Sequence, residues 1–190
     1  MARWRPGARE RLEQAALDLF LEQGFAQTTV AQIAARAGLT TRTFFRHFDD
    51  KREVFFAGDE LMPEQVQRLM AQAAPTLAPM ELIAEHLGAA AEDVFQGRSR
   101  DYLRRRRSVI DAEPALQERE LRKFSEMSKA LERGFRGRGN DPLTAQLAAE
   151  LAVTAFRVGA TRWIEESDDI DLRSSISRTL VAITRVAGQA

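Results

Sequence analysis

The chain has 190 residues, enough for one or two small domains with hydrophobic cores. Its 28 basic and 28 acidic side chains balance, so the chain as a whole carries no polyelectrolyte signal. It contains no cysteine and two histidines, which excludes a disulfide framework and argues against a zinc site of the usual ligands. No apolar run reaches the roughly 20 residues of a membrane span, and the first residues lack the core of a signal peptide, so we expect a cytoplasmic protein without membrane contact.

Charge is distributed unevenly along this neutral chain. Residues 1–52 hold nine basic and six acidic side chains (+3), so residues 53–190 hold 19 basic and 22 acidic side chains (−3). A basic excess at one end fits a segment that contacts DNA. Residues 1–7 form a basic tail that either orders in a DNA minor groove or stays disordered without a function.

The first predicted helix spans about residues 8–23. Its apolar residues recur at helical spacing and give one buried face, and Gly24 ends it. A shorter helix begins at Thr28 or Thr29, since a threonine side-chain oxygen accepts the backbone N–H groups that a first turn leaves unpaired. Gly38 stops this second helix because glycine adopts the left-handed backbone conformation without a Cβ clash.

A third helix follows directly, capped by Thr40 and with Phe44 and Phe48 on its apolar side. Two short helices around a turn that contains glycine are typical of a helix-turn-helix motif, whose second helix enters the DNA major groove. An αα-hairpin in some other helical protein is the alternative. The polar side of the third helix favours DNA, because it carries hydroxyl groups and positive charge and no acid before Asp49.

Residues 9–56 resemble the N-terminal domain of the TetR family of bacterial transcriptional repressors. The matching segments are ARERLEQAALDLFLEQGF, TTVAQIAARAGLTTRTFFRHF and DDKREVFF. The resemblance implies an all-α fold, with a three-helix DNA-binding head in residues 1–60 and a helical effector-binding and dimerisation body in residues 61–190. It further implies a ligand-responsive regulator, commonly a repressor. Such a protein binds a palindromic operator in double-stranded DNA as a homodimer and is released by a small-molecule effector, which the sequence does not identify.

Residue chemistry and the resemblance together select the candidate DNA contacts. Arg42 is the first choice for a base contact, since guanine accepts bidentate hydrogen bonds from arginine. Thr41 and Thr43 are expected to read or position bases. Thr29, Thr40, His47 and Lys51 are expected to fix the DNA backbone. The complete set is Thr29, Thr40, Thr41, Arg42, Thr43, Phe45, Arg46, His47 and Lys51. The family usually has tyrosine, whose hydroxyl commonly touches a phosphate, where this chain has Phe45; we expect Phe45 either to contact a thymine methyl group or to pack.

A fourth helix is predicted to start near Asp50, capped by Asp49 or Asp50. Lys51 then lies in its first turn, and an exposed helix N-terminus with a lysine is a phosphate-binding site. The resemblance implies the same role for Lys51. Pro63 interrupts the pattern, so the helix either kinks there or stops near Asp59 before a new helix begins at Pro63.

The rest of the chain is expected to be helical, which gives an all-α protein of about nine or ten helices. Further helices are predicted over about 80–96, 100–111, 115–136, 142–166 and 171–187. The last two carry long apolar stripes and small residues that allow close approach; in the last helix the stripe is Ile176, Leu180, Ile183 and Val186 or Ala187. We predict that they form the homodimer interface; burial of these faces inside one subunit is the alternative.

The resemblance also places an effector pocket among the helices between about residues 80 and 165. Its candidate lining residues are Phe95, Tyr102, Arg105, Phe124, Met127, Phe156 and Trp163. The alternative for the aromatic residues and Met127 is plain hydrophobic core. Four consecutive arginines at 104–107 cannot share one helix face, so they either meet water and acids or turn one or two guanidinium groups toward an anionic effector.

No catalytic residue, metal or cofactor is expected. A helical enzyme would need a nucleophile with its base, a metal cluster or a phosphate loop, and two distant histidines without a cysteine offer little to build one. A helical partner-binding protein whose head has lost DNA binding remains the other alternative, because of Phe45.

Overall fold

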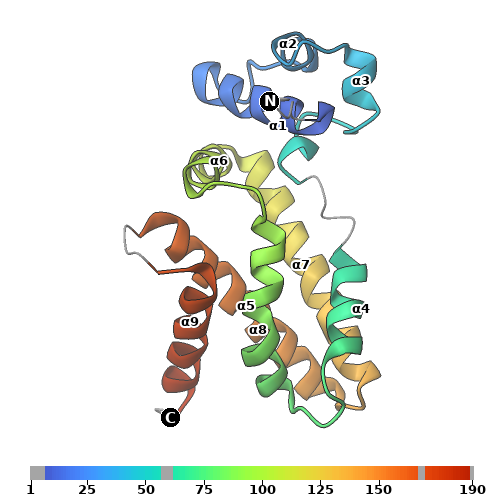
Figure 1. Ribbon diagram of the computed structural model, residues 1–190, viewed down its shortest axis with the longest axis vertical. Coiled ribbons are helices and arrows are strands. Elements are labelled where there is room, and N and C mark those ends of the chain that lie inside the picture. Colours follow the sequence, from blue (N-terminus) through green and yellow to red (C-terminus); the bar gives the residue numbers. More distant parts are fainter. Residues whose placement is uncertain (1–6, 57–61, 167–169, 189–190) are drawn as a thin grey trace, which may run out of the picture. The chain divides into compact units, whose positions relative to one another are not determined.

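A computed structural model describes residues 7–56, 62–166 and 170–188 (Figure 1). These residues contain no strand, and the predicted all-α fold is confirmed. The basic tail at 1–6 and the expected helix end near Asp59 lie outside the described residues. The described helices, in chain order, are α1 (Ala8–Gln23), α2 (Val30–Arg36), α3 (Thr41–Phe45), the 3-10 helix η1 (Glu53–Phe55), α4 (Met62–Gln72), α5 (Pro79–Phe95), α6 (Arg100–Ala112), α7 (Pro114–Gly137), α8 (Pro142–Glu165) and α9 (Leu172–Ala187).

The chain divides into two compact units. One comprises Met1–Asp59 and Asp101–Leu121, and the other comprises Glu60–Arg100 and Arg122–Ala190. Most of α6 and the first turns of α7 therefore pack with the three N-terminal helices. The functional division into a head of residues 1–60 and a body of residues 61–190 stays a prediction, and its boundary falls on residues outside the described part.

The first unit has its own hydrophobic core. Its largest fully buried side chains include Leu12 and Leu17 of α1, Phe44 of α3 and Phe56 after η1. Each such side chain contributes about 1.5–3 kcal/mol when it leaves water. Helices α6 and α7 add Val109, Ile110 and Leu116 to the same cluster. This shared core holds α1, α2 and α3, the blue helices of Figure 1, in one arrangement.

The segment after α3 differs from the predicted fourth helix. Residues 49–52 form bends, and only the short η1 follows before the described chain resumes at α4. The carboxylate of Asp50 accepts hydrogen bonds from the backbone N–H groups of Arg52 and Glu53, at 2.6 and 3.3 Å, and thus closes a local turn. Of the two alternatives for Pro63, a new helix that begins there agrees with the start of α4 at Met62.

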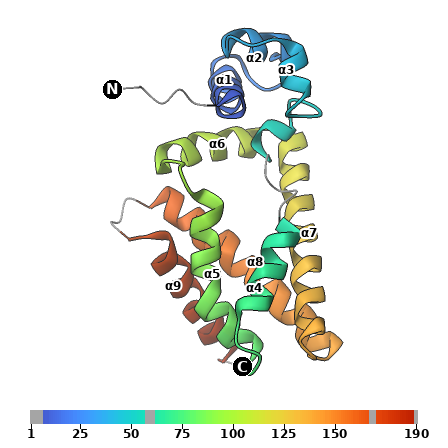
Figure 2. The same ribbon diagram turned by 45° about the vertical axis from the view of Figure 1, so that its right-hand side comes forward.

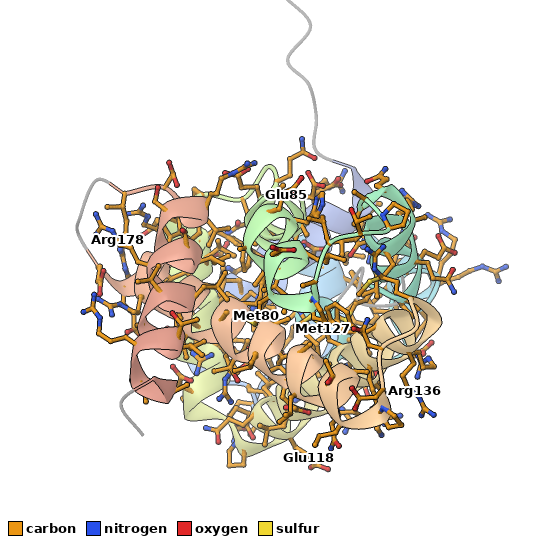
Figure 3. All side chains as sticks on the ribbon, turned by 90° about the horizontal axis from the view of Figure 1, so that it is seen from below. Met80, Glu85, Glu118, Met127, Arg136 and Arg178 are labelled. Carbon is orange, nitrogen blue, oxygen red and sulfur yellow. The ribbon has the colours of Figure 1, made fainter. Side chains whose placement is uncertain are left out.

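The second unit is a helical bundle built on small residues. Helix α8 buries a row of alanines, including Ala145, Ala149 and Ala155, so that neighbouring helices approach it closely. Figures 1 and 2 both show α8 and α9 side by side. In the view of Figure 3, Met80 and Met127 lie toward the middle of the bundle, and Arg178 of α9 lies at its edge. No helix in the described part of the chain is long and apolar enough to span a bilayer.

Candidate functional site

Helix α2 starts at a capping box formed by Thr29 and Gln32. The backbone N–H of Gln32 donates to Thr29 Oγ1 at 3.3 Å, and Gln32 Oε1 accepts from the backbone N–H of Thr29 at 2.8 Å. Each side chain thus satisfies a donor that the start of a helix leaves unpaired. The predicted cap at Thr29 is confirmed; Thr28 instead buries its hydroxyl and donates to Gly24 O at 2.8 Å.

The turn between α2 and α3 is fixed by Gly38 and by a long-range arginine. Gly38 has φ +65°, a conformation that a side chain strains, and the N–H of Leu39 donates to Ala34 O at 2.8 Å. Arg11 of α1 donates from Nε to Ala37 O at 3.1 Å and from Nη2 to Gly38 O at 3.2 Å. Arg11 is not among the predicted site residues, because nothing local in the sequence marks a contact across 26 residues.

Helix α3 presents a polar face and buries the opposite one. Thr40 caps it, since the N–H of Thr43 donates to Thr40 Oγ1 at 3.1 Å. Phe44 is fully buried, and Phe48, just past the helix, is 4 % exposed. The residues left exposed on α3 and its C-cap are Thr41, Arg42, Phe45 and Arg46. The apolar side of the predicted helix is therefore confirmed, and the guanidinium-bearing side faces solvent.

The exposed cations of this helix are available for an external partner. Within the described residues, neither Arg42 nor Arg46 has an ion pair or hydrogen bond through its side chain. In contrast, Arg36 of α2 pairs with Glu22, at 2.7 Å between Nη2 and Oε2, and Arg52 pairs with Asp50. The hydrogen bonds and charges of the Arg36–Glu22 pair lower the pKa of Glu22 and raise the pKa of Arg36. Among the described residues, the positive charge on α3 is thus left uncompensated.

The other candidate DNA contacts are partly engaged within the protein. The hydroxyl groups of Thr29 and Thr40 serve as caps, and Thr43 Oγ1 lies 3.0 Å from Thr40 Oγ1. His47 is half-buried, and its Nε2 atom is inaccessible to solvent and has no hydrogen-bond partner among the described residues. Of the hydroxyl-bearing candidates, Thr41 is exposed and serves no cap.

Lys51 occupies a different environment from the one predicted. Its Nζ donates to the backbone carbonyls of Phe25 and Thr28 at 2.7 and 2.8 Å, and lies 4.3 Å from the centre of the Phe25 ring. These bonds tie Lys51 to the turn that precedes α2. The helix N-terminus that Lys51 was expected to share with a phosphate is absent, because the described residues around it form bends rather than an α-helix.

The candidate effector residues separate into two groups. Phe95, Phe156 and Trp163 lie together in the second unit: the Phe95 and Phe156 rings stack with centres 5.9 Å apart, and Trp163 is 6.1 Å from Phe95. Phe124 contacts Phe156 with ring centres 6.4 Å apart, and Met127 packs on the same core.

Tyr102 and Arg105 belong to the first unit, whereas this cluster belongs to the second. Tyr102 packs against the core of the first unit, and Arg105 forms an ion pair with Asp18 of α1, with 2.8 Å between Nη2 and Oδ1. The arginine run at 104–107 also supplies Arg106, which donates to Phe55 O, and Arg107, which pairs with Asp111 and Glu120. The described contacts of these three arginines therefore favour pairing with neighbouring acids and carbonyls over an inward anion site.

The predicted dimer helices expose apolar side chains, but from partly different positions. On α8, Leu147 and Val158 are 54 % and 38 % exposed. On α9, Ile176 and Leu180 are buried inside the same subunit, and Ile183 packs against its core. The predicted stripe of α9 is thus mostly intramolecular. Of its predicted residues Val186 is exposed, and Val181 is a second outward apolar side chain that was not predicted.

An α-helical unit with two capped helices around a glycine turn, and with uncompensated arginines on the second helix, defines a helix-turn-helix DNA-binding regulator. Residues 13–57 match the model of the family described as bacterial regulatory proteins, tetR family. The chain is 30% identical over 168 residues to the HTH-type transcriptional regulator TcmR of Streptomyces glaucescens, an alignment that covers 84% of this chain and 74% of TcmR. The chain belongs to the TetR family, and it is a transcriptional regulator rather than an enzyme.

Two further comparisons extend over nearly the whole chain. The HTH-type transcriptional repressor BepR of Brucella suis is 26% identical over 189 residues, which cover 92% of this chain and 89% of BepR. The solved structure of SmeT, the repressor of the Stenotrophomonas maltophilia multidrug efflux pump SmeDEF, is 25% identical with a TM-score of 0.55, and the match covers 92% of this chain and 89% of SmeT. The similarity therefore includes the helices beyond the DNA-binding unit.

Proposed function

We propose that this protein is a ligand-responsive transcriptional repressor that binds a palindromic operator as a homodimer and is released by a small-molecule effector. The observation that carries the proposal is the exposed, uncompensated pair Arg42 and Arg46 on a helix whose other side is locked into a core. A repressor function is supported by the descriptions of BepR and SmeT as repressors.

In this proposal α3 lies in the major groove. Arg42 donates two hydrogen bonds to a guanine edge, Thr41 contacts a neighbouring base, and Arg46 binds a phosphate. Thr29, Thr40 and Lys51 support α3 from within the protein rather than contacting bases. Thr29 and Thr40 cap the starts of α2 and α3, and Lys51 holds the turn before α2. His47 is assigned to the same supporting group because its Nε2 atom is buried.

Dimerisation is proposed through the outward faces of α8 and α9. A single unit with one short recognition helix makes few base contacts, whereas two copies on half-sites about 34 Å apart double them. The exposed apolar side chains of these helices suit an interface of this kind, since water leaves them when two copies pair. They are Leu143, Leu147, Val158, Val181 and Val186.

The effector region is proposed at the aromatic cluster of the second unit. Phe95, Phe124, Phe156 and Trp163 provide apolar ring faces, and the indole Nε1 of Trp163 is buried without a hydrogen-bond partner among the described residues. A buried donor without a partner is costly, and an effector that carries an acceptor would satisfy it. An effector that prefers one of two conformations then shifts the population away from the DNA-binding state.

The proposal is tested by selecting DNA from a random-sequence library with the wild-type protein and footprinting the enriched sequence. We expect a palindrome with two equivalent half-sites and one dimer bound. Failure to enrich any sequence would overturn the DNA-binding function, and enrichment of one asymmetric half-site by a monomer would overturn the homodimer.

A further inference from the structure

Phe45 is the one large apolar side chain among the exposed residues of α3, and it is 57 % exposed. The core of the unit does not require it, because Phe44 and Phe48 already fill the buried side of the helix. Its ring meets the ring of Phe44 edge to face, with the centres 5.5 Å apart and an interplanar angle of 82°. Since Phe44 is fully buried, this contact anchors a ring that points outward on the polar side.

The surroundings of Phe45 indicate what covers the ring. Thr41 lies one helical turn before it, Arg42 lies three residues before it and Arg46 directly follows it, so the ring sits among cations and a hydroxyl. A rim with two arginines suits a polyanion and does not suit an apolar protein surface. A phenylalanine also has no hydroxyl to donate to a phosphate, so its contribution on DNA must be apolar.

The major groove of duplex DNA presents one apolar group on its base edges, the C5-methyl group of thymine. We infer that Phe45 is a specificity-determining residue that packs on a thymine methyl group next to the base pair read by Arg42. This inference rests on the proposed DNA-binding function and adds a further base contact from α3. The other apolar surface of DNA, deoxyribose, is the same at every sequence and would give affinity without specificity.

The test uses the full chain and the operator selected as above, in which each thymine is replaced singly by deoxyuridine. This replacement removes the methyl group and leaves the hydrogen-bonding edge unchanged. Loss of one buried methyl-sized group is expected to weaken wild-type binding about fourfold at one position of each half-site. The Phe45→Ala variant is expected to bind more weakly and to lose sensitivity at that same position, whereas Phe45→Leu keeps part of it.

The Leu21→Ala variant provides a matched control, because Leu21 is an exposed apolar residue of the same unit on α1, 41 % exposed. It should keep the full deoxyuridine penalty. Circular dichroism establishes that Phe45→Ala is folded, as expected for a ring that is largely exposed. An equal penalty in wild type and Phe45→Ala, or no penalty at any thymine, would overturn the inference while leaving DNA binding intact. Loss of all operator binding by wild type would instead remove the proposed function itself.

Discussion

The guanidinium of Arg119 in α7 forms two parallel hydrogen bonds with the carboxylate of Glu53 in η1. Arg119 Nε lies 2.9 Å from Glu53 Oε1, and Arg119 Nη2 lies 3.1 Å from Glu53 Oε2. The same guanidinium stacks over the Phe56 ring, 4.8 Å from its centre. This pair ties the segment after the helix-turn-helix to α7. Residues far along the chain therefore contribute to the stability of the first unit, which contains the helix-turn-helix.

Replacement of Arg119 by alanine is expected to lower the free energy of unfolding by about 1–2 kcal/mol, since it leaves Glu53 without its bidentate partner and uncovers Phe56. Urea unfolding measures the change, and hydrogen exchange of the η1 and α3 amides should become faster. Arg122→Ala is the control on the same helix, because the Arg122–Glu126 pair is exposed on both sides. Equal effects of the two variants would contradict a specific role for Arg119.

Replacement of Lys51 by alanine is expected to act on stability as well as on DNA binding. The ammonium bonds to the carbonyls of Phe25 and Thr28 disappear, which should cost about 1–3 kcal/mol and loosen the turn before α2. Arg46→Ala removes a cation that has no partner in the described part of the chain, so it should leave the unfolding midpoint unchanged and lower the salt dependence of DNA binding. If Lys51→Ala unfolds like wild type and lowers only the salt dependence, then Lys51 contacts phosphate rather than the protein.

Replacement of Gly159 by alanine is expected to separate α8 from α9. A Cβ at this position would lie 2.9 Å from the Cα atom of Ile176, a distance at which backbone must move. The expected loss of unfolding free energy is about 1–3 kcal/mol. Gly137→Ala is the control, because a Cβ at the end of α7 meets nothing within 4 Å. A Gly159→Ala protein as stable as wild type would show that the two helices adjust without cost.

The N-caps of α8 and α9 predict a pH dependence. Hydrogen bonds from Thr144 to Asp141, and from the backbone N–H of Ser174 to Asp171, lower the pKa of both carboxyl groups. Their contribution to stability is therefore complete above the unfolded-state pKa of about 3.9 and is lost as the pH falls through the lower folded-state pKa. The melting-temperature difference between wild type and the Asp141→Ala, Asp171→Ala double variant should shrink from pH 6 to pH 3. A melting-temperature difference that stays constant from pH 6 to pH 3 would contradict the conclusion that ionised carboxylates cap these two helices.

Helix bounds in this chain were predictable because their signals are local. Asp141 with Pro142 marks the start of α8, and Gly24 and Gly38 end α1 and the α2 turn with positive φ angles. The exception is the segment after Asp50. There the sequence has the composition of a helix start, but Asp50 binds the backbone N–H groups of Arg52 and Glu53 in a turn. Burial raises the pKa of Asp50, yet hydrogen bonds from Arg52 outweigh it and the net pKa is lowered.

Contacts between distant residues were not predictable from the sequence. Arg11 bonds the α2–α3 turn and Lys51 bonds Phe25 across 26 residues each, and no spacing rule specifies such partners. For the same reason Arg105 was assigned to an effector pocket, whereas the structure pairs it with Asp18. The apolar periodicity of α9 was read correctly, but periodicity does not distinguish a face buried inside one subunit from a face buried between two.

We propose above that Arg42 reads a base from the exposed face of α3. Fluorescence anisotropy of wild type and Arg42→Ala on the selected operator and on a scrambled duplex, at the same salt concentration, tests it directly. We predict that Arg42→Ala, which removes one bidentate base contact of about 1–3 kcal/mol from each of the two half-sites, loses about 30- to 25,000-fold in operator affinity and much less on the scrambled duplex. An Arg42→Ala protein that still prefers the operator by the wild-type ratio would contradict the claim.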